Sequence, residues 1–337
     1  MWAKLLNGLG RVIPLREMVS LHQGKLLVVL YHLVCDDYLP HVRPLYAYRS
    51  VPTLDADIET FLKHYIPITL PELIAQRHTL RPFEHPRILL TFDDGLRQCA
   101  DIVAPMLAAK GIPAAFFLCP PLMDNRQLMY RHQVALLLHR LEEQPQLAHA
   151  MRSCFQEAGY PAQSAAPNLR ALKAQDQPLL ERLTQLAELD IPAFLATQRP
   201  YMTWAQAREM QRMGFDFGAH SLHHWPYQGL TEAEQLEETR ASLDIVQQQL
   251  ALPYRAFAFP FYDHGLPRTL LYRLVRGPQR IADLTLGTSG LKRDVHRRSL
   301  QRVDMERWPL PATSILKQAY LRAAMRTLAL RNRMKRA

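Results

Sequence analysis

Short apolar runs alternate with helix-like segments along this chain, and that alternation limits the possible folds more than any other feature. The expected strands are residues 26–32, 88–92, 114–118, 215–219, 256–259 and 281–286. Between them, residues 99–110 and 204–213 have helical patterns that end at a glycine, and Thr231 and Glu234 have the spacing of a capping box. This order is typical of parallel strands covered by helices, so the sequence predicts an α/β fold.

Residues 120–200 interrupt this rhythm with helices rich in Gln, Leu, Arg and Glu. They follow the strand expected at 114–118, on the side of a parallel sheet where loops usually carry the chemistry. We therefore expect a helical insertion that shapes a substrate cleft. The predicted organisation is a main domain at 1–306, with its core at about 25–119 and 200–303, followed by a basic amphipathic helix at 307–337.

Two adjacent carboxylates, Asp93 and Asp94, stand at the end of the apolar run 88–92 and precede Gly95. Burying a carboxylate costs several kcal/mol unless it is paired or binds a metal. Neighbouring side chains on an extended segment point in different directions, so one Asp is able to bind a metal while the other faces water or substrate. An ordinary Asp-Gly turn with solvated carboxylates is the structural alternative.

A histidine cluster follows the strand expected at 215–219 in the same way. His220 and His224 are four residues apart, so a helical turn after the strand would place both imidazoles on one side. Two His and one Asp form an open site for a divalent metal that keeps a water. His223 competes as a ligand, and a chance pair among 14 histidines is the alternative.

Together, Thr91-Phe92-Asp93-Asp94-Gly95 and His220-Ser221-x-x-His224 resemble the first two motifs of the polysaccharide deacetylases, the NodB-homology carbohydrate esterases of family 4. The resemblance implies a distorted (β/α)7 barrel. It assigns Asp93 as the general base and Asp94, His220 and His224 as metal ligands. The implied cofactor is a divalent metal, usually zinc, with Co²⁺, Ni²⁺ or Mn²⁺ as substitutes.

The third family motif is incomplete. Pro260 and Phe261 match it, and Phe261 inherits the role of offering its backbone N–H to the oxyanion, but Ala258 occupies the position of the usual Arg. The sequence therefore predicts that Asp93 lacks its usual orienting partner. Asp263 and His264 follow in the same segment, and a simple loop turn accounts for both.

The late family motifs, which supply a general acid His and its acidic partner, are not recognisable after residue 265. Tyr31-His32 instead ends an early apolar strand in the way of poly-N-acetylglucosamine deacetylases, so His32 is the candidate general acid. A His with a pKa near neutrality suits proton donation to a departing amine. A structural role is the alternative, since a lone His at a strand end is commonly structural.

The net charge of +10 is concentrated near the end of the sequence, because residues 307–337 contain eight basic residues and no acidic one. An apolar stripe through Leu316, Tyr320 and Ala323, flanked by Arg322 and Arg326, fits a helix on an anionic membrane surface. A helix packed on the domain with a solvated basic face fits equally well. Residues 312–337 contain a single aromatic, Tyr320, and no nucleic-acid module accompanies them, which argues against nucleic-acid binding.

The chain starts without the pattern of a secretory signal, and no apolar run approaches the ~18 residues of a membrane span. These observations predict a cytoplasmic protein, peripheral on the inner face of the cell membrane if the basic helix binds there. The predicted function is a metal-dependent hydrolase that removes an N-acetyl or other N-acyl group from an amino sugar in a polysaccharide, oligosaccharide or lipid-linked saccharide. Action on another small amide, deformylation included, and non-catalytic saccharide or membrane binding are the alternatives.

Overall fold

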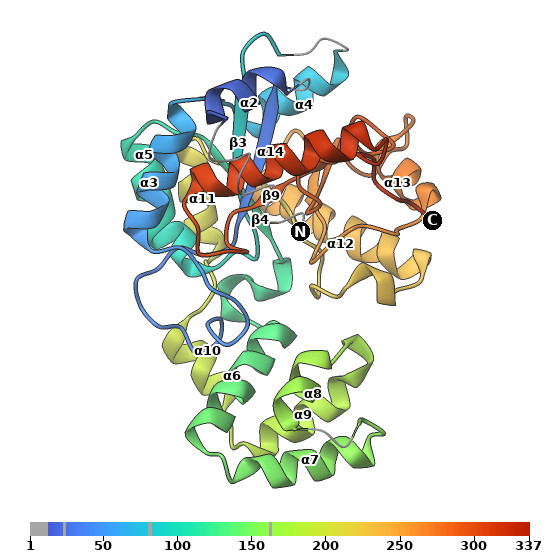
Figure 1. The fold of residues 1–337 in the computed structure, drawn as a ribbon. Helices are drawn as coiled ribbons and strands as arrows, with labels where there is room; N and C mark the ends of the chain where they lie inside the picture. The colour runs from blue at the N-terminus through green and yellow to red at the C-terminus, as the bar shows by residue number, and fades with distance from the viewer. Residues whose placement is uncertain (1–12, 23–24, 80–82, 162–163) are drawn as a thin grey trace.

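The computed structural model of the chain describes residues 13–22, 25–79, 83–161 and 164–337 (Figure 1). The chain start, on which the expectation about a secretory signal rests, lies outside the described residues. The strands are β1 Leu26–Tyr31, β2 Ile66–Pro67, β3 Arg87–Phe92, β4 Ala114–Leu118, β5 Asp216–Ala219, β6 Ala256–Ala258, β7 Leu284–Gly287, β8 Ser299–Gln301 and β9 Val303–Asp304.

The helices of the main domain are α2 Leu15–Leu21, α3 Val51–Leu62, α4 Leu70–His78, α5 Ala104–Ala109, α11 Trp204–Arg212, α12 Glu232–Leu250, α13 Arg268–Val275 and α14 Ala312–Leu328. The region from 120 to 200 contains α6 Tyr130–Glu143, α7 Leu147–Glu157, α8 Ala165–Ala171, α9 Gln177–Leu186 and α10 Ile191–Gln198. A π-helical turn, η1 Cys99–Val103, precedes α5, and short 3₁₀ turns are η2 Pro120–Asn125, η3 Ala174–Asp176 and η4 Tyr227–Gly229.

The parallel strands form a nearly closed barrel. Their order is β8-β7-β6-β5-β4-β3-β1-β9, with β2 paired to β3. The two strands at the ends of this order, β8 and β9, are consecutive in the sequence and are separated by one residue, Arg302. The chain therefore crosses from one edge of the sheet to the other at Arg302, and the predicted distorted parallel barrel is confirmed.

Most strands begin and end close to where the apolar runs predict. The exception is the run 281–286, because the Ala282 N–H donates to Leu274 O at the end of α13 and the strand starts only at Leu284. The short polar strands β8 and β9 were not predicted. The capping box of Thr231 and Glu234 forms at the start of α12, and Gly111 and Gly214 take positive φ after their helices, as expected.

The insertion helices α6 to α9 form a separate group below the barrel (Figure 1). They have their own apolar core, built from buried side chains such as Val134, Leu137, Phe155 and Leu183. Phe261, in the loop after β6, packs against this core. The insertion therefore supports a barrel loop that the sequence associates with the site.

Helix α14 crosses the barrel (Figure 1) and packs on α2 and α3. The apolar stripe that the sequence identifies is buried there, through Leu316, Tyr320 and Ala323, and the Tyr320 hydroxyl lies 2.7 Å from that of Tyr65. Within the described residues, no helix has the length and apolar character that a membrane crossing requires.

A buried ion cluster joins the segment after α14 to the loop after β6. The Arg336 guanidinium pairs with the carboxylates of Asp263, at 2.5 Å, and Asp294, and all three side chains are almost completely buried. Gln301 at the end of β8 donates to both carboxylates, at 2.8 and 3.0 Å. Asp263 is thus structural, which agrees with the loop-turn interpretation.

Removing the Arg336 charge leaves Asp263 and Asp294 buried without a counterion. We expect Arg336→Met to lower the free energy of unfolding by about 3–5 kcal/mol, measured by urea denaturation. Arg333→Met is the matched control, because Arg333 is exposed, and it should change stability by less than about 0.5 kcal/mol. Equal stability of the two variants would contradict the role of the cluster.

Candidate active site

Asp93 and Asp94 follow β3 directly and point in different directions. The Asp93 N–H continues the sheet by donating to Tyr31 O at 2.9 Å, whereas Asp94 and Gly95 both take positive φ, +72° and +69°. The chain therefore turns at once after Asp93, and the two carboxylates, both nearly inaccessible to solvent, meet different partners.

Arg302 holds Asp93 in a bidentate ion pair. Its two terminal nitrogens donate to Asp93 Oδ1 and Oδ2, each at 2.7 Å, and the side chain is completely buried. A further bond from Arg302 to Thr91 Oγ1, at 3.2 Å, fixes the guanidinium to the same strand. The prediction that Asp93 lacks an orienting Arg is therefore wrong. Ala258 does occupy the position of the usual Arg, but Arg302, between β8 and β9, orients Asp93 instead.

The Arg302 pair also sets the protonation of Asp93. Burial by itself would raise the pKa of this carboxyl, but Arg302, assisted by nearby His220 and His32, lowers it below its ordinary value. Asp93 is consequently ionised at neutral pH and can accept a proton.

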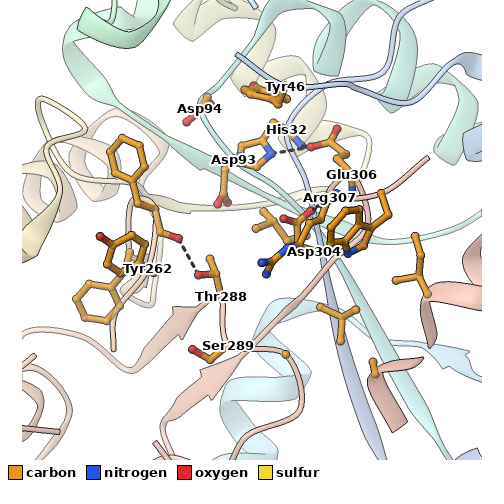
Figure 2. Close-up of a pocket in the computed structure, with 18 of the residues that line it drawn as sticks. His32, Tyr46, Asp93, Asp94, Tyr262, Thr288, Ser289, Asp304, Glu306 and Arg307 are labelled. Atoms are coloured by element: carbon orange, nitrogen blue, oxygen red, sulfur yellow. Dashed lines mark hydrogen bonds and ion pairs between the residues drawn. The ribbon is translucent and has the colours of Figure 1, made fainter. Parts of the chain in front are cut away.

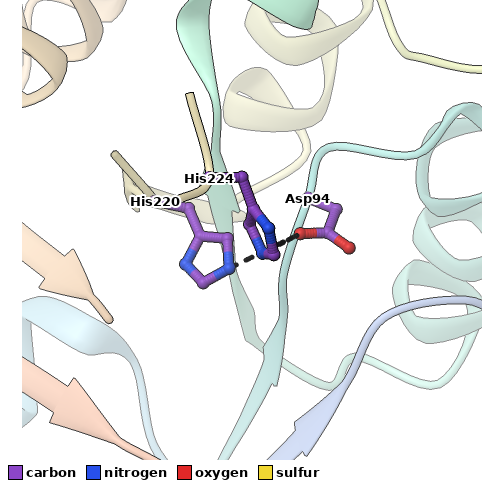
Figure 3. A group of neighbouring side chains, drawn as sticks. All are labelled: Asp94, His220 and His224. Carbon is purple, nitrogen blue, oxygen red and sulfur yellow. Dashed lines mark ion pairs between the residues drawn. The ribbon is translucent and has the colours of Figure 1, made fainter. Parts of the chain in front are cut away.

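Asp94, His220 and His224 converge on one point (Figure 3). Asp94 Oδ1 lies 3.4 Å from His220 Nε2 and 3.3 Å from His224 Nε2. The His220 ring is oriented by its other nitrogen, because Nδ1 lies 2.8 Å from Ala258 O and donates to it. This hydrogen bond leaves Nε2, which faces Asp94, as a lone-pair donor.

The two histidines meet without a helical turn. Ser221 and His224 both take positive φ, +67° and +55°, and the segment is an irregular loop. The expected helical geometry is thus wrong, although the predicted pair of imidazoles is brought together. His223 points elsewhere, with Nδ1 2.5 Å from Glu238 Oε1, and is not part of the group.

These three side chains fit a divalent metal. Each offers one ligand atom, the three ligand atoms lie within 4.8 Å of one another, and all three residues are buried. Among the described residues, Asp94 Oδ1 and His220 Nε2 are buried without a hydrogen-bond partner. Burial raises the pKa of Asp94 in spite of nearby His32 and His220, so this carboxylate lacks a counterion of its own. A cation would satisfy both atoms.

His32 lies in the same pocket and is held by Glu306 (Figure 2). Glu306 Oε2 accepts from His32 Nδ1 at 2.6 Å and from the His32 N–H at 2.9 Å, and Oε1 accepts from the Leu33 N–H at 3.1 Å. Burial lowers the pKa of His32, but the Glu306 contact and the carboxylates of Asp94 and Asp93 outweigh it and raise the pKa to about 10.

Phe261 lies beside the histidine pair. It takes positive φ, +54°, its ring lies 4.8 Å from that of His224, and Thr288 Oγ1 donates to its carbonyl at 2.7 Å. The loop that carries its backbone N–H therefore lines the site from the β6 side. The proposed oxyanion role of this N–H remains a prediction.

One cavity of about 880 Å³ is lined by both aspartates, by His32, His220 and His224, and by Glu306 and Phe261. The size falls in the range of pockets that hold small ligands, roughly 300–1,000 Å³. Its walls include aromatic side chains, Tyr46, Tyr262 and Trp308, and residues Met129, Arg131 and His132 from the insertion. The insertion thus contributes to the cleft, as expected from its position in the sequence.

Comparison with known proteins gives the family of this site. The polysaccharide deacetylase family profile matches residues 81–153 and 180–270, a region that contains both metal-ligand motifs. The chain belongs to the polysaccharide deacetylase family. No curated protein sequence matches it.

Two solved structures resemble the chain over most of its length. The deacetylase PplD of Streptococcus pyogenes, in complex with acetate, is 13% identical, with a TM-score of 0.54 over 87% of this chain and 97% of that one. IcaB from Ammonifex degensii is 17% identical, with a TM-score of 0.54 over 88% and 97%. At these identities the likeness establishes the shared deacetylase fold.

Sequence reasoning missed two residues of this site, Arg302 and Glu306. Both come after residue 265, where no late family motif is recognisable. Their partners lie far away in the sequence, 209 residues for Asp93 and 274 for His32. The available signal is weak: two apolar positions, Leu300 and Val303, flank Gln301 and Arg302 in a stretch too short and polar to be identified as a strand.

Metal binding tests the ligand group. We expect the purified protein to bind about one equivalent of divalent metal, measured by elemental analysis, and His220→Ala to lose it because one of three ligands is gone. His223→Ala is the control, since His223 lies in the same loop but contacts Glu238 instead. Asp94→Asn, which keeps the side-chain shape, should lose the metal as well. Full metal content in His220→Ala would show that the ligand set is wrong.

Proposed function

We propose that this protein is a metal-dependent hydrolase that removes an N-acetyl group from an amino sugar in a polysaccharide, oligosaccharide or lipid-linked saccharide. One observation carries the proposal: an ionised Asp93 clamped by Arg302 and a protonated His32 clamped by Glu306 line the same pocket as the Asp94-His220-His224 group. Amide hydrolysis needs a base for the water and an acid for the leaving amine, and this pocket offers both.

The residues of the site have separate roles in metal binding and proton transfer. Asp94, His220 and His224 would hold the metal, which supplies Lewis acidity toward the attacking water and the carbonyl oxygen. Asp93 accepts the proton of the water, and Arg302 keeps both carboxylate oxygens oriented for this. His32 Nδ1 is occupied by Glu306, so Nε2 is the atom that donates a proton to the departing amine. The Phe261 N–H stabilises the charge on the oxygen of the acyl group.

Family membership supports an N-acetylated carbohydrate as substrate, and the aromatic walls of the pocket suit the apolar faces of sugar rings. Zinc as the native metal, and a location at the cytoplasmic face of the membrane, remain predictions from the sequence.

Release of acetate from N-acetylglucosamine oligomers is the direct test. We expect wild-type protein to release acetate and Asp93→Asn to be slower by at least about 10² while keeping its metal, because only the base is lost. Asp101→Asn, a half-exposed carboxylate outside the pocket, is the control. Unchanged acetate release by Asp93→Asn would show that Asp93 is not the general base. Release of formate but not acetate from matched N-formyl and N-acetyl sugars would favour the deformylase alternative.

The pH dependence reports on His32. A raised pKa keeps His32 protonated below about 10, so its contribution is present at neutral pH and is lost as the pH rises through that pKa. Glu306→Gln removes the charge that raises the pKa, so the alkaline limb of kcat/KM should move to lower pH by roughly 1–3 units.

Glu238→Gln is the control for that experiment. Glu238 binds His223 and two backbone N–H groups, those of Leu222 and His223, in the same way that Glu306 binds His32, but outside the pocket. The alkaline limb of kcat/KM in Glu238→Gln should lie at the same pH as in wild type. An alkaline limb that is the same in Glu306→Gln as in wild type would show that His32 is not the acid.

A further inference from the structure

The basic flank of α14 faces the active-site cavity. Gln318, Ala319, Arg322 and Arg326 line the cavity that also contains the Asp94-His220-His224 group. The neighbouring stripe of α14 packs into the core, so the helix is fixed with these arginines at the wall of the pocket.

Lys292 contributes a third cation from the loop after β7, next to Ser289 and Gly290 on the same wall. Burial and nearby Arg326 lower the pKa of Lys292, and burial and nearby Arg322 lower that of Arg326. Arg326 is therefore close enough to repel both Lys292 and Arg322. We call Lys292, Arg322 and Arg326 the cationic wall.

No carboxylate pairs with the cationic wall in the part of the chain that the structure describes. The acids nearby already have partners: Asp93 has Arg302, Glu306 has His32, and Asp263 has Arg336. Asp304 accepts from the backbone N–H groups of Glu306 and Arg307. Three partly buried cations without a carboxylate partner, grouped in one ligand pocket, point to an anionic ligand.

We propose that the cationic wall binds a phosphate group carried by the saccharide substrate, beside the site of N-acetyl removal. This rests on the proposed function and narrows its substrate class. Near neutral pH a phosphate carries one negative charge as a diester and up to two as a monoester, and it offers more acceptor oxygens than a carboxylate to two guanidinium groups and an ammonium group. The cavity has room for a sugar ring and a phosphate together.

Binding of two matched sugars tests the proposal. Metal-loaded wild-type protein is titrated calorimetrically with N-acetylglucosamine 1-phosphate and with the neutral methyl glycoside of N-acetylglucosamine. We expect the phosphate to bind at least about tenfold more tightly, and this preference to weaken with added salt. In Lys292→Met/Arg326→Met the affinity ratio should fall to about one.

Arg331→Ala/Arg333→Ala is the matched control, because it removes the same two charges from exposed positions near α14. It should keep the preference. Equal affinity of wild-type protein for both sugars, or a preference that survives in Lys292→Met/Arg326→Met, would overturn the proposal.

A third ligand distinguishes the source of the phosphate. A prenyl phosphodiester of the same sugar should bind more tightly than the monoester if the substrate is lipid-linked, and no more tightly if it is a soluble sugar phosphate; either result keeps the phosphate site. Acetate release separates this proposal from the deacetylase proposal. If the protein hydrolyses the neutral glycoside but shows no preference for the phosphate, only the phosphate-binding proposal is overturned. If it prefers the phosphate but releases no acetate, only the deacetylase proposal is overturned.

Discussion

The ion pair between Arg302 and Asp93 is the interaction on which the site depends, and closure of the barrel determines its position. Strands β8 and β9 pair with opposite edges of the sheet, and Arg302 is the single residue between them. Both backbone polar groups of Arg302 are hydrogen-bonded: its N–H donates to Gly287 O, and its carbonyl accepts from the Gly290 N–H. Its guanidinium therefore lies inside the barrel where a buried carboxylate needs a counterion.

Because Arg302 neutralises Asp93, the adjacent Asp94 remains as the carboxylate without a counterion. Two adjacent buried acids can both stay ionised only if each has its own cation. One cation is part of the chain, and the other would be the metal between Asp94, His220 and His224. Because the two carboxylates have different counterions, they also have different chemical roles. The assignment of Asp93 as base and Asp94 as metal ligand thus depends on the position of Arg302 between β8 and β9 as much as on the Asp-Asp-Gly motif.

The chain uses one carboxylate arrangement twice, with different outcomes. Glu306 and Glu238 each accept from a His ring and from two consecutive backbone N–H groups. His32 faces the pocket next to two further carboxylates, and its pKa rises to about 10. His223 lies half exposed, and Glu238 raises its pKa without other acids nearby. Location decides which of these imidazolium groups can act on a substrate.

The sequence predicted the parts of the site that are local, and missed those that depend on distant pairing. The strand ends, Asp93, Asp94, His220 and His224 follow from short motifs, but Arg302 and Glu306 become visible only when the barrel closes.

Likewise, the apolar and basic stripes of α14 are present in the sequence, but periodicity does not show what covers each stripe. The apolar stripe contacts α2 and α3, and two basic residues face the pocket. A net charge of +10 therefore does not lie wholly on the outer surface, since Arg322 and Arg326 line the cavity, whereas Arg302 and Arg336 cancel against the buried carboxylates with which they pair. Arguments from net charge to membrane or nucleic-acid affinity apply only to the remaining exposed residues.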